Sequence, residues 1–160
     1  MSNFAFGTYR ISDLNPQHIE ALKEAIESGI TMIDTSSNYM DGGAERAIAL
    51  AFREFDDYKR DEIEIVGKFG YIQGTNLLNY KKGLLAIENA QEVVEYNQEC
   101  YHSISKQFMR DQLTESLKRL EIEKIDCYLV HNPEYYILDA LRRDVSKDER
   151  LDEMYRRLQE

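Results

Sequence analysis

The run Ile30-Thr31-Met32-Ile33-Asp34 decides the fold, because this short apolar strand ends on a carboxylate and is flanked by helical patterns. Upstream, Asn15-Pro16 supplies an N-cap followed by a proline at the first helical position, and Gly29 is placed to end the helix. Downstream, the Asp41-Gly42-Gly43 turn precedes an apolar stripe from Ala47 to Phe55 that predicts a second amphipathic helix. The pattern therefore predicts alternating strands and helices.

The same alternation continues along the chain. Further strands are predicted over residues 4–11, 63–68 and 125–130, and further helices over residues 104–120 and from a capping box at 146–149 onward. Consecutive strand-helix units require a parallel sheet with right-handed crossovers, so the fold is a doubly wound sheet or part of a (β/α)₈ barrel. The first strand is not followed by the G-x-G-x-x-G turn of a dinucleotide-binding sheet, which favours the barrel.

Two features depart from simple repetition. Residues 70–103 form a long irregular stretch, interpreted as a loop insertion on the active-site side, with a weak helical pattern around residues 86–96. The last helix reaches Glu160 without a stop signal, so we expect the sequence to end inside an element. The fold class expected is α/β, the first four β-α units of a TIM barrel, forming one domain over residues 1–160.

Composition limits the class of protein. The chain has 160 residues, 42% of them hydrophobic, and a formal net charge of −10, which argues against nucleic acid or an anionic membrane as a partner. Cys100 and Cys127 have neither metal-ligand nor disulfide-scaffold spacing, and the sequence shows no signal peptide or membrane-spanning run. We therefore expect a soluble, cytoplasmic protein.

Ionisable residues stand where successive predicted strands end. Asp34, Lys68 and His131 close three strands, and Tyr39 lies in the loop after Asp34. Active sites of parallel barrels form at the carboxyl ends of the strands, so these four side chains are predicted to converge in one cavity. Taken singly, each residue is more often a cap or a solvated charge, and only their shared position favours catalysis. No metal site is predicted, because His18 and His102 have no ligand partners nearby in the sequence.

Sequence motifs around these residues resemble the aldo-keto reductase family. Residues 33–39, Ile-Asp-Thr-Ser-Ser-Asn-Tyr, followed by Gly42-Gly43 and Glu45, resemble the first family signature. Val66-Gly67-Lys68 resembles the strand with the family lysine, and residues 116–133 resemble the helix-strand pair that delivers the family histidine. The motifs occur in the family's order and span nearly the whole chain.

The resemblance implies reduction of a small aldehyde or ketone by hydride from NADP or NAD, with Asp34, Tyr39, Lys68 and His131 as catalytic residues. It also implies cofactor contacts from Thr35, Asp34 and Asn132. A phenol has an ordinary pKa of about 10, so proton donation at neutral pH needs a partly buried cation beside it. Lys68 is expected to supply this cation and Asp34 to hold it. The family's cofactor phosphate site belongs to the second half of the barrel, which we expect to lie outside this sequence.

Two other classes of protein remain open. The chain could be a non-enzymatic half-barrel module that self-associates through its open edges, without an intact cofactor site. It could also be a hydrolytic or metal-dependent barrel that uses Asp34 and His131, although no further spaced ligands accompany them.

Overall fold

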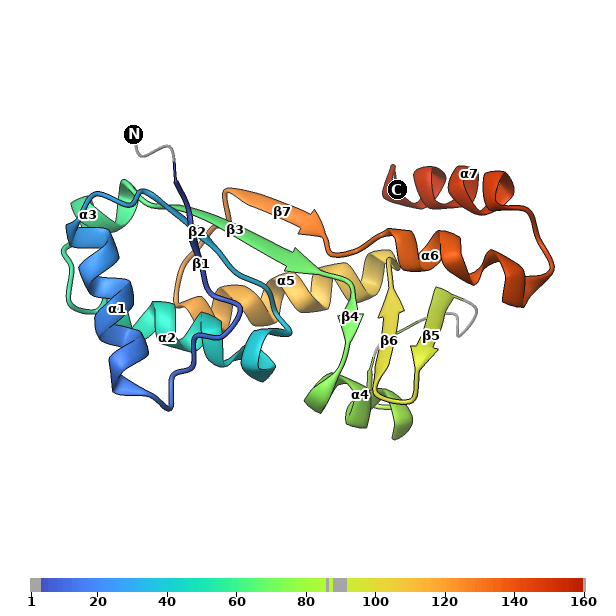
Figure 1. Ribbon diagram of the computed structural model, residues 1–160, viewed down its shortest axis with the longest axis horizontal. Coiled ribbons are helices and arrows are strands. Elements are labelled where there is room, and N and C mark those ends of the chain that lie inside the picture. The colour runs from blue at the N-terminus through green and yellow to red at the C-terminus, as the bar shows by residue number, and fades with distance from the viewer. Residues whose placement is uncertain (1–3, 86, 88–91, 160) are drawn as a thin grey trace. The chain divides into compact units, whose positions relative to one another are not determined.

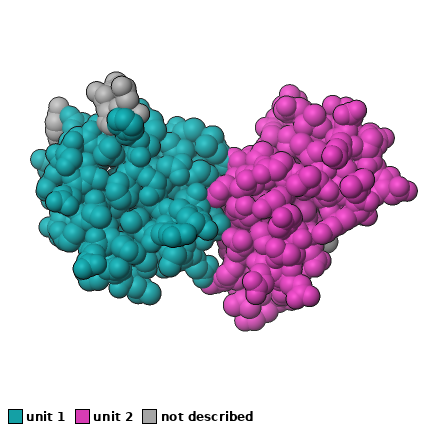
Figure 2. All heavy atoms as spheres, in the orientation of Figure 1, with its two compact units in different colours: residues 1–68, 114–129 teal, residues 69–113, 130–160 magenta. Residues whose placement is uncertain are grey.

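The computed structural model describes residues 4–85, 87 and 92–159. The chain divides into two compact units, coloured separately in Figure 2. The first contains the chain up to Lys68 together with Thr114–Leu129, and the second contains Phe69–Leu113 and Val130–Glu160.

A four-stranded sheet organises the first unit, with strand order β1-β2-β3-β7 (Figure 1). Its strands are β1 (Phe6–Gly7), β2 (Met32–Asp34), β3 (Glu64–Phe69) and β7 (Cys127–Val130). The pairs β1·β2 and β2·β3 are parallel, with Ile33 opposite both Phe6 and Ile65. The four predicted strands are thus confirmed, although β1 is much shorter than the predicted run over residues 4–11.

The helices of the first unit are α1 (Pro16–Glu27), the 3₁₀ turn η1 (Tyr39–Gly42), α2 (Gly43–Phe52), α3 (Asp57–Asp61) and the C-terminal part of α5 (Lys106–Leu120). The three helices predicted in this unit are present as α1, α2 and α5, whereas η1 and α3 were not predicted. The Asn15 side chain accepts a hydrogen bond from the Gln17 amide, and Gly29 beyond the helix end has a φ of +94°. In the described part of the chain, no helix is long and apolar enough to cross a membrane.

One face of this sheet is covered by helices and forms the core of the first unit. Ile33 and Ile65 point into a cluster with buried side chains of α1, α2 and α5, among them Leu22, Ile48 and Leu120. Side chains alternate across a strand, so Asp34, Lys68 and Leu129 fall on or near the opposite face. Leu129 there is 43% exposed.

The described residues of the 70–103 segment contain regular helix and strands, so the predicted irregular loop is wrong there. This segment forms β4 (Tyr71–Ile72), α4 (Gly74–Lys81), β5 (Val93–Asn97) and β6 (Cys100–Ser103). The three strands make an antiparallel sheet in the order β4-β6-β5. The strand-helix alternation of the other segments does not predict this sheet, because β5 and β6 pair as an antiparallel hairpin.

The weak helix predicted around residues 86–96 is wrong where it can be compared. Residues 93–96 belong to β5, in which Val93 and Val94 are buried. β-branched side chains favour a pleated surface over a helix. Residues 86 and 88–91 lie outside the described part of the chain.

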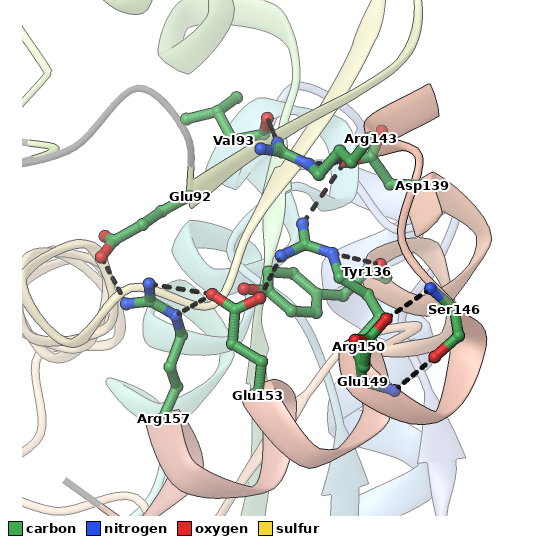
Figure 3. A network of polar contacts seen from close by, with 10 residues as sticks. All are labelled: Glu92, Val93, Tyr136, Asp139, Arg143, Ser146, Glu149, Arg150, Glu153 and Arg157. Atoms are coloured by element: carbon green, nitrogen blue, oxygen red, sulfur yellow. Dashed lines mark hydrogen bonds and ion pairs between the residues drawn. The ribbon is translucent and has the colours of Figure 1, made fainter. Parts of the chain in front are cut away.

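The second unit ends in α6 (Glu134–Leu138), the 3₁₀ helix η3 (Asp139–Arg143) and α7 (Lys147–Leu158). The predicted capping box of α7 is confirmed, since Ser146 and Glu149 exchange side-chain and backbone hydrogen bonds. The 3% exposed Arg150 fixes this helix, because its guanidinium stacks on the Tyr136 ring and contacts Asp139 and Glu153 (Figure 3). Arg157 extends the same network to Glu92 and Glu153.

Candidate active site

Lys68 brings together three residues of the first unit. Its Nζ donates to Asp34 Oδ1 at 2.6 Å and to the Thr35 carbonyl at 2.9 Å, and it lies 3.4 Å from Tyr39 Oη. The Lys68 side chain is 13% exposed and that of Asp34 is 35% exposed. The ammonium is therefore partly desolvated, as a cation that acts on a neighbouring phenol must be.

Neighbouring parallel strands create this arrangement. Asp34 of β2 pairs with Val66 of β3, so Lys68 lies two residues further along β3 on the same face of the sheet. Beyond the ends of the strands, the Thr35 amide donates to the Val66 carbonyl and the Ser37 amide to the Lys68 carbonyl. The loop that leads to Tyr39 is therefore attached to β3 by its backbone.

A left-handed turn fixes Tyr39. The three residues after it, Met40, Asp41 and Gly42, have φ values of +51°, +54° and +81°. Two of them are not glycine, so the turn carries backbone strain of the kind found at functional sites. A Cβ on Gly42 would lie 2.7 Å from Arg119 Cδ, which explains glycine at this position of the motif. The Tyr39 ring is 9% exposed and packs edge-on against Tyr9 at 5.2 Å.

Glu45, the acidic residue of the same motif, has a structural role. Its side chain is fully buried and accepts a hydrogen bond from Arg119 Nε at 2.6 Å. This ion pair joins α2 to the C-terminal part of α5 within the first unit. A buried carboxylate left without its arginine would be strongly destabilising.

His131 and Asn132 lie just beyond β7, in the second unit. The His131 amide donates to the Phe69 carbonyl at 2.7 Å, and its ring packs edge-on against Tyr71 with centroids 4.8 Å apart. Asn132 has a φ of +49°, accepts from Tyr71 Oη and donates to Glu134. The convergence of His131 with Asp34, Tyr39 and Lys68 stays a prediction.

Two residues near His131 were missed by the sequence interpretation. His102 falls in the stretch predicted to be irregular, but it lies in β6, is fully buried and contacts the His131 carbonyl at 2.6 Å. Tyr71 stood at the start of the supposed irregular stretch and was not singled out. Only the cross-strand pairing of Tyr71 with His102 brings them to His131, and no motif spacing signals it.

The cofactor contacts that the family resemblance implies are Asp34 and Thr35 in the first unit and Asn132 in the second. Asp34 keeps an accessible carboxylate beside the Tyr39 and Lys68 pair. Thr35 is fully buried, its Oγ1 has no partner among the described residues, and its carbonyl is the group that reaches Lys68. The Asn132 amide is already engaged by Tyr71 and Glu134, which leaves it one free hydrogen-bond donor position.

The fold and this site define an α/β protein with a lysine-centred polar cluster at the carboxyl ends of parallel strands. Residues 3–159 match the aldo/keto reductase family, and the chain belongs to that family. The resemblance found in the sequence motifs is thereby confirmed.

Individual relatives are distant. The chain is 28% identical over 116 residues to aldo-keto reductase YhdN of Bacillus subtilis, covering 72% of the chain and 28% of that protein. It is 27% identical over 139 residues to the NADH-specific methylglyoxal reductase of Escherichia coli, covering 82% of the chain and 38% of that protein. The chain therefore spans well under half the length of these relatives.

Solved structures agree on the fold. The holo form of aldo-keto reductase AKR11C1 from Bacillus halodurans matches with a TM-score of 0.60 and 19% identity, over 88% of this chain and 43% of that one. An aldo/keto reductase from Klebsiella pneumoniae, in complex with NADP and acetate, matches with a TM-score of 0.52 and 23% identity, over 88% and 42% of the two chains. These matches support the α/β fold.

Proposed function

We propose that the protein carrying this chain reduces small aldehydes or ketones with a nicotinamide cofactor, and that Tyr39 is the general acid. The observation that carries the proposal is the Lys68 ammonium, 2.6 Å from Asp34 and 3.4 Å from Tyr39 Oη. Within the proposal, the chain provides the first four β-α units of a (β/α)₈ barrel.

Each residue has a distinct role in this proposal. The reduced nicotinamide, when bound, supplies the hydride. The Tyr39 phenol donates its proton to the substrate carbonyl oxygen, and the Lys68 ammonium stabilises the phenolate that remains. Asp34 aims the ammonium and keeps it protonated, while His131 donates a hydrogen bond that orients the substrate carbonyl. Thr35, Asp34 and Asn132 are assigned to the cofactor side of the site.

Replacing the proposed acid tests this function. In Tyr39→Phe, carbonyl reduction should fall by about 1,000-fold while cofactor affinity stays nearly unchanged, because the phenol donates a proton and does not hold the nicotinamide. The assay follows oxidation of NADPH and of NADH with a panel of aldehydes that includes methylglyoxal, for which one relative is named. Tyr9→Phe is the matched control, because it removes a neighbouring hydroxyl and keeps the ring contact with Tyr39. Nearly normal turnover in Tyr39→Phe would eliminate Tyr39 as the acid.

A self-associating half-barrel module is the alternative function, favoured by one observation. β1 and β7 are the edge strands of the parallel sheet, and Leu129 on β7 is 43% exposed. Unpaired edge strands with exposed apolar residues favour pairing with another chain. Analytical ultracentrifugation of the 160-residue chain with NADPH separates the two functions. A stable dimer that does not bind cofactor supports the module, and a monomer that binds NADPH at micromolar concentration contradicts it.

A further inference from the structure

His102 holds the backbone of the residue that the proposed function assigns to the substrate carbonyl. His102 Nε2 lies 2.6 Å from the His131 carbonyl oxygen, and the His102 side chain is fully buried. A carbonyl oxygen only accepts hydrogen bonds, so Nε2 must carry the proton and donate. The opposite tautomer would place a nitrogen lone pair against the carbonyl oxygen inside the protein, where the repulsion is poorly screened.

The second unit fixes the backbone of His131 from two directions. The His131 amide donates to the Phe69 carbonyl at 2.7 Å, while its carbonyl accepts from His102. Both polar groups of this peptide segment are therefore occupied, which limits rotation of the backbone that carries the imidazole. β6 is also attached to the chain next to Phe69, because the Ser103 amide donates to the Gly70 carbonyl at 2.8 Å.

Gly70 leaves room for the contact between His102 and His131 because it has no side chain. A Cβ at Gly70 would lie 2.5 Å from His102 Nε2 and 2.9 Å from the His131 carbonyl oxygen. The φ of Gly70 is +137°, a conformation that residues with a side chain rarely adopt. The missing side chain thus leaves the space through which the His102 imidazole reaches His131.

Tyr71 orients the His131 ring from the neighbouring strand. It is the cross-strand partner of His102 and packs edge-on against the His131 imidazole at 4.8 Å. Its hydroxyl donates to Asn132 Oδ1 at 2.9 Å and lies 3.3 Å from Tyr135 Oη. Burial, reinforced by Tyr135, raises the pKa of the Tyr71 hydroxyl, so it remains a neutral donor at physiological pH.

We propose that His102, together with Tyr71, is a positioning residue for His131, so that the sheet formed by β4, β5 and β6 sets the geometry of the carbonyl-binding imidazole. This inference deepens the proposed function and rests on it for the role of His131. The described strands of the 70–103 segment, expected to be an irregular loop, thereby support His131.

Substitutions at His102 that differ in reach test the positioning role. His102→Gln keeps an N–H donor near the position of Nε2, whereas His102→Asn is one methylene too short and His102→Leu has no donor. Small misplacements of a reacting group can lower turnover by up to about 100-fold, so kcat should fall at least about 10-fold in His102→Leu. The same principle predicts that kcat in His102→Gln stays within about threefold of the unmodified protein. Cofactor affinity and the melting temperature are measured in every variant.

A second readout does not depend on activity. In nitrogen-15 histidine NMR of the same variants, the imidazole signals of His131 should shift and broaden in His102→Leu and return in His102→Gln. Tyr101→Phe is the matched control, because Tyr101 is the adjacent residue of β6 and contacts Tyr80 instead. If His102→Leu does not fold, His102→Asn takes its place with the same expectations.

The possible results distinguish the positioning role of His102 from the proposed carbonyl reductase function. A folded His102→Leu protein with unchanged His131 signals and unchanged kcat overturns the positioning role. Equal losses in the Gln and Leu variants also overturn it, because lost packing rather than a lost donor would then be the cause. If the unmodified protein reduces no carbonyl compound, the proposed function fails, while the NMR comparison still decides whether His102 positions His131.

Discussion

Lys68 Nζ lies 2.6 Å from Asp34 Oδ1, and this pair joins two neighbouring parallel strands on the face of the sheet opposite its helices. The lysine follows the aspartate by 34 positions in the sequence, yet strand pairing places the two charges in contact. Because the ammonium also reaches Tyr39 Oη, the ion pair connects the strand ends to the proposed proton donor.

Removing the charge of Asp34 should weaken catalysis more than folding. In Asp34→Asn, Lys68 keeps its other contacts but loses the carboxylate that aims it, so kcat should fall by about 10- to 100-fold. Steady-state kinetics with NADPH measures the effect. Glu121→Gln is the control, because Glu121 forms an exposed ion pair with Arg53. Equal kcat values in the two variants would contradict the proposed role of Asp34.

Loss of Arg150 should destabilise the second unit. Arg150 is 3% exposed and contacts Asp139, Glu153 and the Tyr136 carbonyl, so Arg150→Ala leaves buried polar groups without a partner. Breaking a buried ion pair in this way costs about 3 kcal/mol. Urea unfolding measures the change, and Arg156→Ala on the exposed side of α7 should cost under about 0.5 kcal/mol. If both variants lost the same free energy of unfolding, the buried contacts of Arg150 would not stabilise the second unit.

The network around Glu153 predicts a loss of stability in acid. Burial alone would raise the pKa of Glu153, but hydrogen bonds from Arg150 and Arg157 outweigh it and hold the pKa below its ordinary value. Because the pKa of Glu153 is depressed, its ionised carboxylate stabilises the folded state at pH values above the ordinary glutamate pKa of about 4.3. This stabilisation is lost as the pH falls from there through the lower pKa of the folded state.

Comparing unfolding free energies at pH 7 and pH 3.5 tests the contribution of Glu153. The unmodified chain should exceed Glu153→Gln in stability at pH 7, and the difference should shrink in acid. A difference that is constant with pH would show that ionisation of Glu153 does not contribute.

Gly70→Ala should be costly because two effects add. The new Cβ would approach His102 Nε2 and the His131 carbonyl oxygen, and the φ of +137° is unfavourable for alanine. We expect a loss of about 2 kcal/mol or more. Gly83→Ala isolates the backbone effect, because Gly83 has a φ of +70° and nothing lies within 4 Å of its Cβ position. Thermal unfolding that ranks Gly83→Ala as the more damaging change would contradict the close approach at Gly70.

The strand-helix alternation of the first unit could be predicted from the sequence because its signals are local. An N-cap such as Asn15 and a helix-ending glycine such as Gly29 each act within a few residues of their own position, as does the capping box at Ser146 in the second unit. The predicted contact between Lys68 and Asp34 also followed, since adjacent parallel strands bring their carboxyl ends together.

The sequence by itself therefore determined the parallel sheet, most of its helices, the family and the contact of Lys68 with Asp34 and Tyr39. Only the tertiary structure decided that residues 70–103 contain an antiparallel sheet and that His102 lies buried against the His131 carbonyl. The physical reason is the range of the interactions. Caps and amphipathic stripes act over one or two helical turns, whereas the partner of His102 lies 29 residues away and is brought to it by backbone pairing across strands.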